Sequence, residues 1–286
     1  MNIFYLTSII IGLAVQNVVK KPYTDKTDGK GVYFFSAMTA GAAMLFFVVS
    51  AMISKGNLKF DWGILPYAIG FAVSYAVGTI FSVVAVSCGS LSLTSLIIQY
   101  SLMIPTVYGI FFLNDPISSG LVPGIILLVI SLILINKKDE NIKFSLKWIV
   151  SVLLAFLGNG LCSVFQKMQQ VEFDGQYKDE FMIIALFIVI AVIVFLMIIK
   201  EKGEIGLYVK SGWHFGLACG VMNGMVNLFV MILSGLMPVS LMFPLISAGG
   251  IIVTYIVSKF FYKESLTTAQ FVGFILGIGS VVLLNI

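Results

Sequence analysis

The feature that most constrains this chain is a series of long apolar runs separated by short breaks of charged or turn-forming residues. The hydrocarbon core of a bilayer is about 30 Å thick, and a helix needs about 20 residues to cross it. Ten runs are about that long, at residues 2–19, 31–54, 62–87, 90–112, 117–135, 145–169, 179–199, 212–235, 238–261 and 267–286. We therefore expect an all-α integral membrane protein with ten transmembrane helices.

Composition agrees with this expectation. The chain is 59% hydrophobic and 10% charged, with a mean hydropathy of +1.07, whereas soluble proteins are about half apolar and a quarter charged. The runs do not alternate as the strands of a membrane barrel would, so they favour helices. The first run lacks the positive n-region and cleavage site of a signal peptide, so we interpret it as the first transmembrane helix.

An internal repeat organises the ten runs. Residues 113–136 align without a gap with residues 262–285 at an offset of 149, and this pairs Asp115 with Glu264 and Ser131 with Ser280. Near the start of each half, residues 12–20 and 160–167 share a Gly-Leu pair at an offset of 148. The sequence therefore predicts two five-helix repeats, at 1–140 and 141–286. Because five crossings are an odd number, the second repeat should enter the membrane from the opposite side, as an inverted repeat.

Asp115 and Glu264 each lie in the short turn between the fourth and fifth helices of their repeat. Pro116 follows the first acid, and a Thr267-x-x-Gln270 capping box follows the second. Both patterns are typical of helix starts, and carboxylates are stabilised near a positive helix end. We interpret the two acids as helix caps, with a role as a gate or coupling site as the alternative.

Polar side chains follow one face of several helices, and amides in lipid are costly unless they are paired. We therefore expect these faces to turn inward, either to line a solute cavity or to bond one helix to another. For Lys20, reaching the lipid headgroups is the favoured interpretation and binding an anionic group of a solute is the alternative. The cavity-lining candidates are Gln16, Lys20, Ser95, Gln99, Asn159, Ser163, Gln166, Asn223 and Asn227.

Small residues indicate where helices pack closely. Gly216, Gly220 and Gly224 form a double GxxxG pattern in the eighth helix, and Gly78 belongs to a similar ridge in the third. Such ridges let helix backbones approach one another in a membrane. Pro105 should kink the fourth helix, because proline lacks the backbone N–H of a regular turn.

The last fifty residues carry a resemblance to a known family. Both halves end in an acidic hairpin and a glycine-bearing helix, and the chain reads PVSLMFPLISAGGIIVTYIVSKFFYKESLTTAQFVGFILGIG from Pro238 onward. With its ten helices, this sequence resembles the drug/metabolite transporter superfamily, close to its EamA-like branch. The resemblance implies a carrier of small organic solutes with a central cavity between the halves. The similar small multidrug resistance proteins use a glutamate in their first helix, and residues 2–19 here contain no acid.

Other classes of function are disfavoured. The formal charge is +4 and no arginine occurs, which argues against nucleic-acid binding. The cysteines lack metal-ligand spacing and the sequence shows no catalytic constellation. We therefore expect no enzyme activity, no cofactor and no metal.

The expected function is that of a multi-pass transporter that moves a small organic metabolite or drug-like solute by alternating access. The alternative is a scaffold or lipid-handling component that uses the same fold without transport. The expected partners are a small-molecule solute and the lipid bilayer, and a homodimer is left open. Lysine-only, isoleucine-rich usage is typical of AT-rich bacterial genomes, so the expected location is a bacterial plasma membrane.

Overall fold

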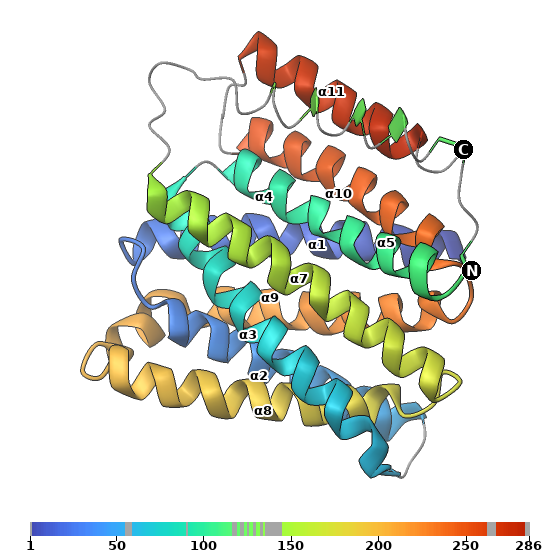
Figure 1. Ribbon diagram of the computed structural model, residues 1–286. Helices are drawn as coiled ribbons and strands as arrows, with labels where there is room; N and C mark the ends of the chain where they lie inside the picture. Colours follow the sequence, from blue (N-terminus) through green and yellow to red (C-terminus); the bar gives the residue numbers. More distant parts are fainter. Residues whose placement is uncertain are drawn as a thin grey trace.

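A computed structural model describes residues 2–54, 59–89, 91–115, 145–261 and 267–283, together with 119–120, 123–124, 126–127, 130–131 and 134. The described residues form helices and no strand (Figure 1). The helices of the first half are α1 (Asn2–Lys26), α2 (Val32–Ser54), η1 (Trp62–Ile64), α3 (Leu65–Cys88), α4 (Leu91–Gln99), η2 (Tyr100–Leu102) and α5 (Met103–Phe112). Those of the second half are α7 (Leu146–Glu172), α8 (Lys178–Lys200), α9 (Ile205–Ser234), α10 (Val239–Phe261) and α11 (Thr268–Leu283).

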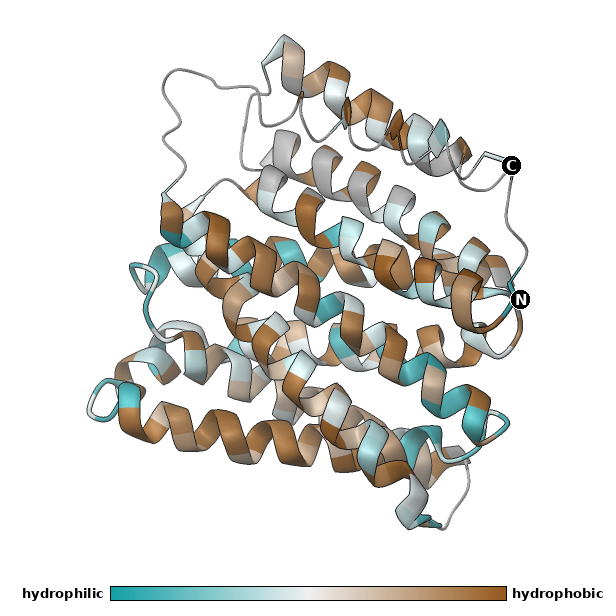
Figure 2. Cartoon of the chain, viewed as in Figure 1, coloured by the Kyte–Doolittle hydropathy of each residue, from teal (hydrophilic) through white to brown (hydrophobic). Residues whose placement is uncertain are grey.

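The surface of the helical body is strongly apolar. Figure 2 shows α8 hydrophobic along nearly its whole length, with hydrophilic residues gathered in the loops at its ends. Phe187 and Phe195 on α8 are 65% and 63% exposed, and monomeric soluble proteins rarely expose such continuous apolar surface. Six helices among the described residues, α1, α2, α3, α7, α8 and α9, are long and apolar enough to cross a membrane.

Two of the expected segments differ clearly from the helices in the structure, and a third cannot be compared. α1 continues past residue 19 to Lys26, where Lys21 and Asp25 form an ion pair of 3.1 Å one turn apart, because a helix can extend beyond the apolar stretch that crosses lipid. α9 begins at Ile205 and has a non-helical residue at Gly212, where the sequence predicted the helix to start. The fifth expected segment, 117–135, lies mostly outside the described residues.

The fourth segment, expected as one kinked helix, is divided into α4, the 3-10 turn η2 and α5. Pro105 has no N–H to donate to the carbonyl four residues earlier, at Ser101, and Ser101 lies in η2. A 3-10 turn replaces the regular helix there, as expected next to a proline.

α1 and α7 run in opposite directions along α9. Tyr5, at the start of α1, packs against Phe229 near the end of α9, with ring centroids 5.1 Å apart. Lys167, near the end of α7, donates from Nζ to the carbonyl of Ser234, the last residue of α9, at 2.9 Å. The start of α1 and the end of α7 therefore lie at the same end of the bundle, as Figure 1 also shows.

Close helix contacts occur at the glycines of α9 and α3. On α9, a Cβ atom at Gly216, Gly220 or Gly224 would stand 2.7 Å from Met38 Cβ, 2.5 Å from Ala42 Cβ and 2.8 Å from Phe46 Cβ, all on α2. On α3, a Cβ atom at Gly78 would stand 3.1 Å from the backbone nitrogen of Asn159 on α7. These glycines therefore allow the backbones of α9 and α3 to approach their partner helices closely.

Candidate functional site

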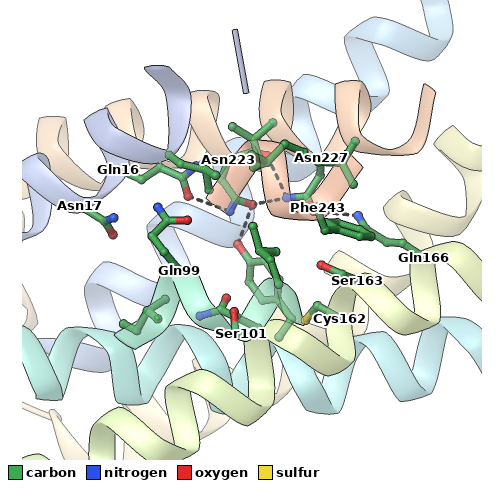
Figure 3. Close-up of a pocket in the computed structure, with 18 of the residues that line it drawn as sticks. Gln16, Asn17, Gln99, Ser101, Cys162, Ser163, Gln166, Asn223, Asn227 and Phe243 are labelled. Carbon is green, nitrogen blue, oxygen red and sulfur yellow. Dashed lines mark hydrogen bonds between the residues drawn. The ribbon is translucent and has the colours of Figure 1, made fainter. Parts of the chain in front are cut away.

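A cavity of about 110 Å³ lies between helices of both halves. α1, α3, α4 and η2 supply its wall from the first half, and α7, α9 and α10 supply it from the second. Eight of the nine sequence candidates line it: Gln16, Lys20, Gln99, Asn159, Ser163, Gln166, Asn223 and Asn227. Figure 3 shows most of them converging on one space from different helices.

Each of the three longest contributing helices presents one continuous face to this cavity. α1 contributes Leu13, Gln16, Asn17 and Lys20, which are spaced at i, i+3, i+4 and i+7. α7 contributes residues 159, 162, 163 and 166, and α9 contributes residues 223, 226, 227 and 230, with the same spacing. This is the spacing at which side chains share one side of an α-helix. Polar stripes in the sequence therefore become the cavity wall.

A chain of hydrogen bonds links the amides of α7, α9 and α1 (Figure 3). Gln166 Nε2 donates to Asn227 Oδ1 at 2.7 Å, and Asn227 Nδ2 donates to Asn223 Oδ1 at 3.0 Å. Asn223 Nδ2 then donates to Gln16 Oε1 at 2.9 Å. The hydroxyl of Tyr75 on α3 also donates to Asn223 Oδ1, at 3.0 Å. The same amides therefore join helices to one another and line the cavity, so the two interpretations of the polar residues do not exclude each other.

The cavity wall carries one lysine and, among the described residues, no aspartate or glutamate. Lys20 lies in this wall one turn beyond Gln16. Lys167, by contrast, bonds to the end of α9 as described above. Among the described residues, no group of three or more histidine, cysteine, aspartate or glutamate side chains is placed to hold a metal ion.

Ser95 is a correction to the expected site. It is 1% exposed on α4 but does not line the cavity, and its hydroxyl oxygen has no partner among the described residues. The expected face continued straight from Ser95 through Gln99, whereas the wall from this segment is formed by Ile98, Gln99, Ser101 and Leu102. The wall therefore continues along this segment from Ile98 into the 3-10 turn at 100–102 and does not extend back to Ser95.

Asp115 bonds to a helix that its local pattern did not indicate, while the start of the helix that it was expected to cap lies outside the described residues. Its Oδ2 accepts a hydrogen bond from the backbone N–H of Ser240, in the first turn of α10, at 3.1 Å. The carboxylate therefore links the end of α5 in the first half to the start of α10 in the second, where a helix end favours negative charge. Its predicted counterpart, Glu264, lies outside the described residues.

Sequence reasoning missed several residues of the wall, namely Asn17, Tyr75, Ser101, Cys162 and Phe243. Asn17 was detectable, because it lies at i+4 from Leu13 on the same face as Gln16. Tyr75 was detectable from the repeat, since it precedes Asn223 by 148 positions. The others are small or apolar residues that resemble helix core in the sequence.

Comparison with protein-family models gives no match for this chain, and comparison with the curated proteins gives none. Among solved structures, a crystal structure described only as that of a protein is similar, with a TM-score of 0.70 at 12% sequence identity. The match covers 98% of this chain and 98% of the other. The fold is therefore shared over nearly the whole length, and a shared fold alone does not assign a function.

Proposed function

We propose that this protein is a multi-pass membrane transporter that moves a small organic solute by alternating access between two inverted five-helix repeats. The observation that carries the proposal is the polar cavity, whose wall comes from helices of both halves. In a transporter built from inverted repeats, the binding site lies between the repeats near the middle of the membrane. A polar space that two halves share can open to either side when the halves move relative to one another.

The directions of the helices support the inverted arrangement. α1 and α7, the first helices of the two halves, run antiparallel along α9. Two further contacts join residues at the repeat offset, since Tyr75 bonds to Asn223 and Ser247 bonds to Gln99, each pair 148 positions apart. Contacts between equivalent positions are expected on the two-fold axis that relates two repeats. The resemblance of the sequence to EamA-like drug/metabolite transporters agrees with this arrangement.

A second candidate is a lipid-handling role without solute transport. An apolar groove of about 330 Å³ runs between α3 and α8, lined by residues such as Val73, Val77, Ile188 and Val192. Such a groove suits an acyl chain, and this candidate requires no movement of solute through the polar cavity.

Reconstitution in liposomes separates the two candidates. The purified protein is tested for uptake of a panel of radiolabelled small metabolites and, in parallel, for movement of fluorescent lipids between leaflets. The transporter proposal expects uptake of at least one solute above protein-free liposomes. Lipid movement without uptake of any solute would favour the second candidate.

Substitutions in the amide chain test the role of the cavity. Gln166→Leu and Asn227→Leu each interrupt the bonds between α7 and α9, and each should lower solute uptake at least about tenfold, a change equal to about 1.4 kcal/mol. Both proteins should remain folded in the membrane. Gln176→Leu is the matched control, because Gln176 is exposed outside the cavity. Uptake at the wild-type rate in both cavity variants would remove the cavity from the transport path.

A further inference from the structure

The orientation of the whole amide chain follows from one backbone carbonyl. Asn227 Nδ2 donates to the backbone oxygen of Asn223 at 2.8 Å, so this atom of Asn227 must be the nitrogen. The same nitrogen lies 3.0 Å from the side chain of Asn223, which must therefore present its oxygen. Asn223 then presents its nitrogen to Gln16, and Gln16 must present its oxygen. The nitrogen Nε2 of Gln16 is therefore the last group in this series of hydrogen bonds.

The Gln16 end of this series of hydrogen bonds has unused donors. Gln16 Nε2 has no partner among the described residues, although Gln16 is only 6% exposed. Asn17 and Gln99 are 6% and 4% exposed, and their side chains line the same cavity. Figure 3 shows these three amides gathered at the same end of the cavity. Buried amides without partners are costly, so a ligand that pairs with them is stabilised there.

Lys20 gives this end of the cavity its charge. It lies four residues after Gln16 and three after Asn17, on the same face of α1, and it lines the same cavity. Among the described residues, Lys21 forms an ion pair with Asp25, and Lys20 forms none. The described wall contributes no acid to balance it. Amides can bind either sign of charge, and the lysine selects a negative one.

From this arrangement we infer that Lys20, Gln16, Asn17 and Gln99 form a subsite for the carboxylate of a small monocarboxylic acid. The inference rests on the proposed function for its biological role, since the acid would be the transported solute. One ammonium group balances one carboxylate, and the amide N–H groups can satisfy the oxygens that the lysine does not reach.

The rest of the cavity limits the remainder of the solute. A volume of about 110 Å³ is well below the roughly 300–1,000 Å³ of pockets that hold drug-sized ligands. Val230, Phe243 and Ile246 add apolar surface to the wall. The site therefore suits a compact acid with a short apolar or hydroxylated body, and its described wall offers no carboxylate for the ammonium group of an amine.

The test compares acids with their uncharged analogues. Purified full-length protein is unfolded thermally in detergent with monocarboxylic acids of two to six carbons, including 2-hydroxy and 2-oxo acids, and with the primary amide of each. A ligand of the folded state raises the apparent melting temperature by mass action. At least one acid should stabilise the wild-type protein more than its amide does. If no acid does so at matched ionic strength, the subsite is wrong.

Variants assign the binding to Lys20. Lys20→Met should weaken binding of the stabilising acid at least tenfold and leave binding of its amide unchanged. Lys21→Met is the matched control, because Lys21 pairs with Asp25 and does not line the cavity; it should bind the acid as the wild-type protein does. Equal binding of the acid by the Lys20 and Lys21 variants would overturn the inference. If Lys20→Met does not fold, the comparison of acids with amides on the wild-type protein still decides.

Proteoliposome uptake distinguishes failure of this inference from failure of the proposed function. An acid that binds through Lys20 but does not cross the membrane would leave the subsite standing and contradict transport. A solute carried at equal rates by the wild-type protein and by Lys20→Met would leave transport standing and overturn the carboxylate subsite.

Discussion

Gly220 on α9 provides the sharpest test of the close contact between α9 and α2. A Cβ atom at this position would lie 2.5 Å from the carbonyl oxygen of Thr39 and 2.5 Å from Ala42 Cβ. Ordinary contacts of this kind are about 3.5–4.0 Å, so Gly220→Ala must push the two helices apart by roughly 1 Å. The backbone oxygen of Thr39 cannot move aside as a flexible side chain can.

The expected cost of Gly220→Ala follows from two opposing effects. Overpacking of a tight contact costs about 1–3 kcal/mol, and alanine gains up to about 1 kcal/mol over glycine within a helix. Because the clash is with a backbone oxygen, the upper part of the overpacking range applies, about 2–3 kcal/mol. The net loss is then about 1–2 kcal/mol, which corresponds to a fall of roughly 2–8 °C in melting temperature. Gly41 on α2 is the matched control, because nothing lies within 4 Å of its Cβ position. Gly41→Ala should therefore stabilise the protein by up to about 1 kcal/mol.

A thiol-reactive fluorescent dye can follow this unfolding in detergent. Cys162 and Cys219 are 8% and 1% exposed in the folded protein, so they react when the helices separate. The same substitution at Gly220 and Gly41 should shift the melting temperature in opposite directions. If Gly220→Ala melts at or above the wild-type temperature, the close approach of α9 to α2 is wrong.

Two further predictions concern carboxylates that bond to the starts of other helices. Asp115→Ala should lower the free energy of unfolding by about 0.5–2 kcal/mol through loss of the cap on Ser240, and Asp115→Asn, which keeps an acceptor oxygen, should lose less; equal thermal stability of the alanine variant and the wild-type protein would contradict the cap. Glu201 accepts from the backbone N–H groups of Tyr33 and Phe34 at 3.0 and 2.9 Å, and burial raises the pKa of its carboxyl although these two bonds oppose that shift. Because folding then favours the protonated form, stability should decrease as pH rises above the usual pKa of about 4.5; melting curves between about pH 5 and pH 8 should show that this decrease is smaller in Glu201→Gln, and an unchanged pH dependence would count against it.

Local patterns in the sequence were sufficient to predict most of the polar residues in the cavity wall. Gln16, Asn159 and Asn223 lie on polar helical faces that can be recognised from the sequence. Because an amide that faces lipid is costly, such a face is expected to turn toward protein. The hydrogen-bond partners were beyond this reasoning. Helical spacing shows which residues share a face and does not show which face of another helix they meet.

Asp115 and Ser95 show where sequence reasoning stops. The local pattern predicted Asp115 as a cap of the helix that follows it, whose start lies outside the described residues, and it gave no sign of the bond to Ser240, which is 125 positions away. That bond depends on the packing of α5 against α10. Ser95 was assigned to the wall by its helical spacing from Gln99, and spacing alone does not show where along a helix the cavity ends. The ten-helix count also stays a prediction, since six spans are shown among the described residues.

The bonds from Tyr75 to Asn223 and from Ser247 to Gln99 have a consequence for how such a protein could move. Each joins residues 148 positions apart, and these would be counterparts if the two halves are inverted repeats at that offset. If the two halves exchange conformations during a transport cycle, the two partners of such a bond exchange roles. The bond itself can therefore persist throughout the cycle. The bond from Asp115 to Ser240 joins positions that are not counterparts, so the same exchange would break it and form the equivalent bond related by the two-fold axis. Tyr75 and Gln99 would then lie near the axis about which the two halves rotate. The bonds to helix starts at the ends of the bundle would form in one conformation and break in the other.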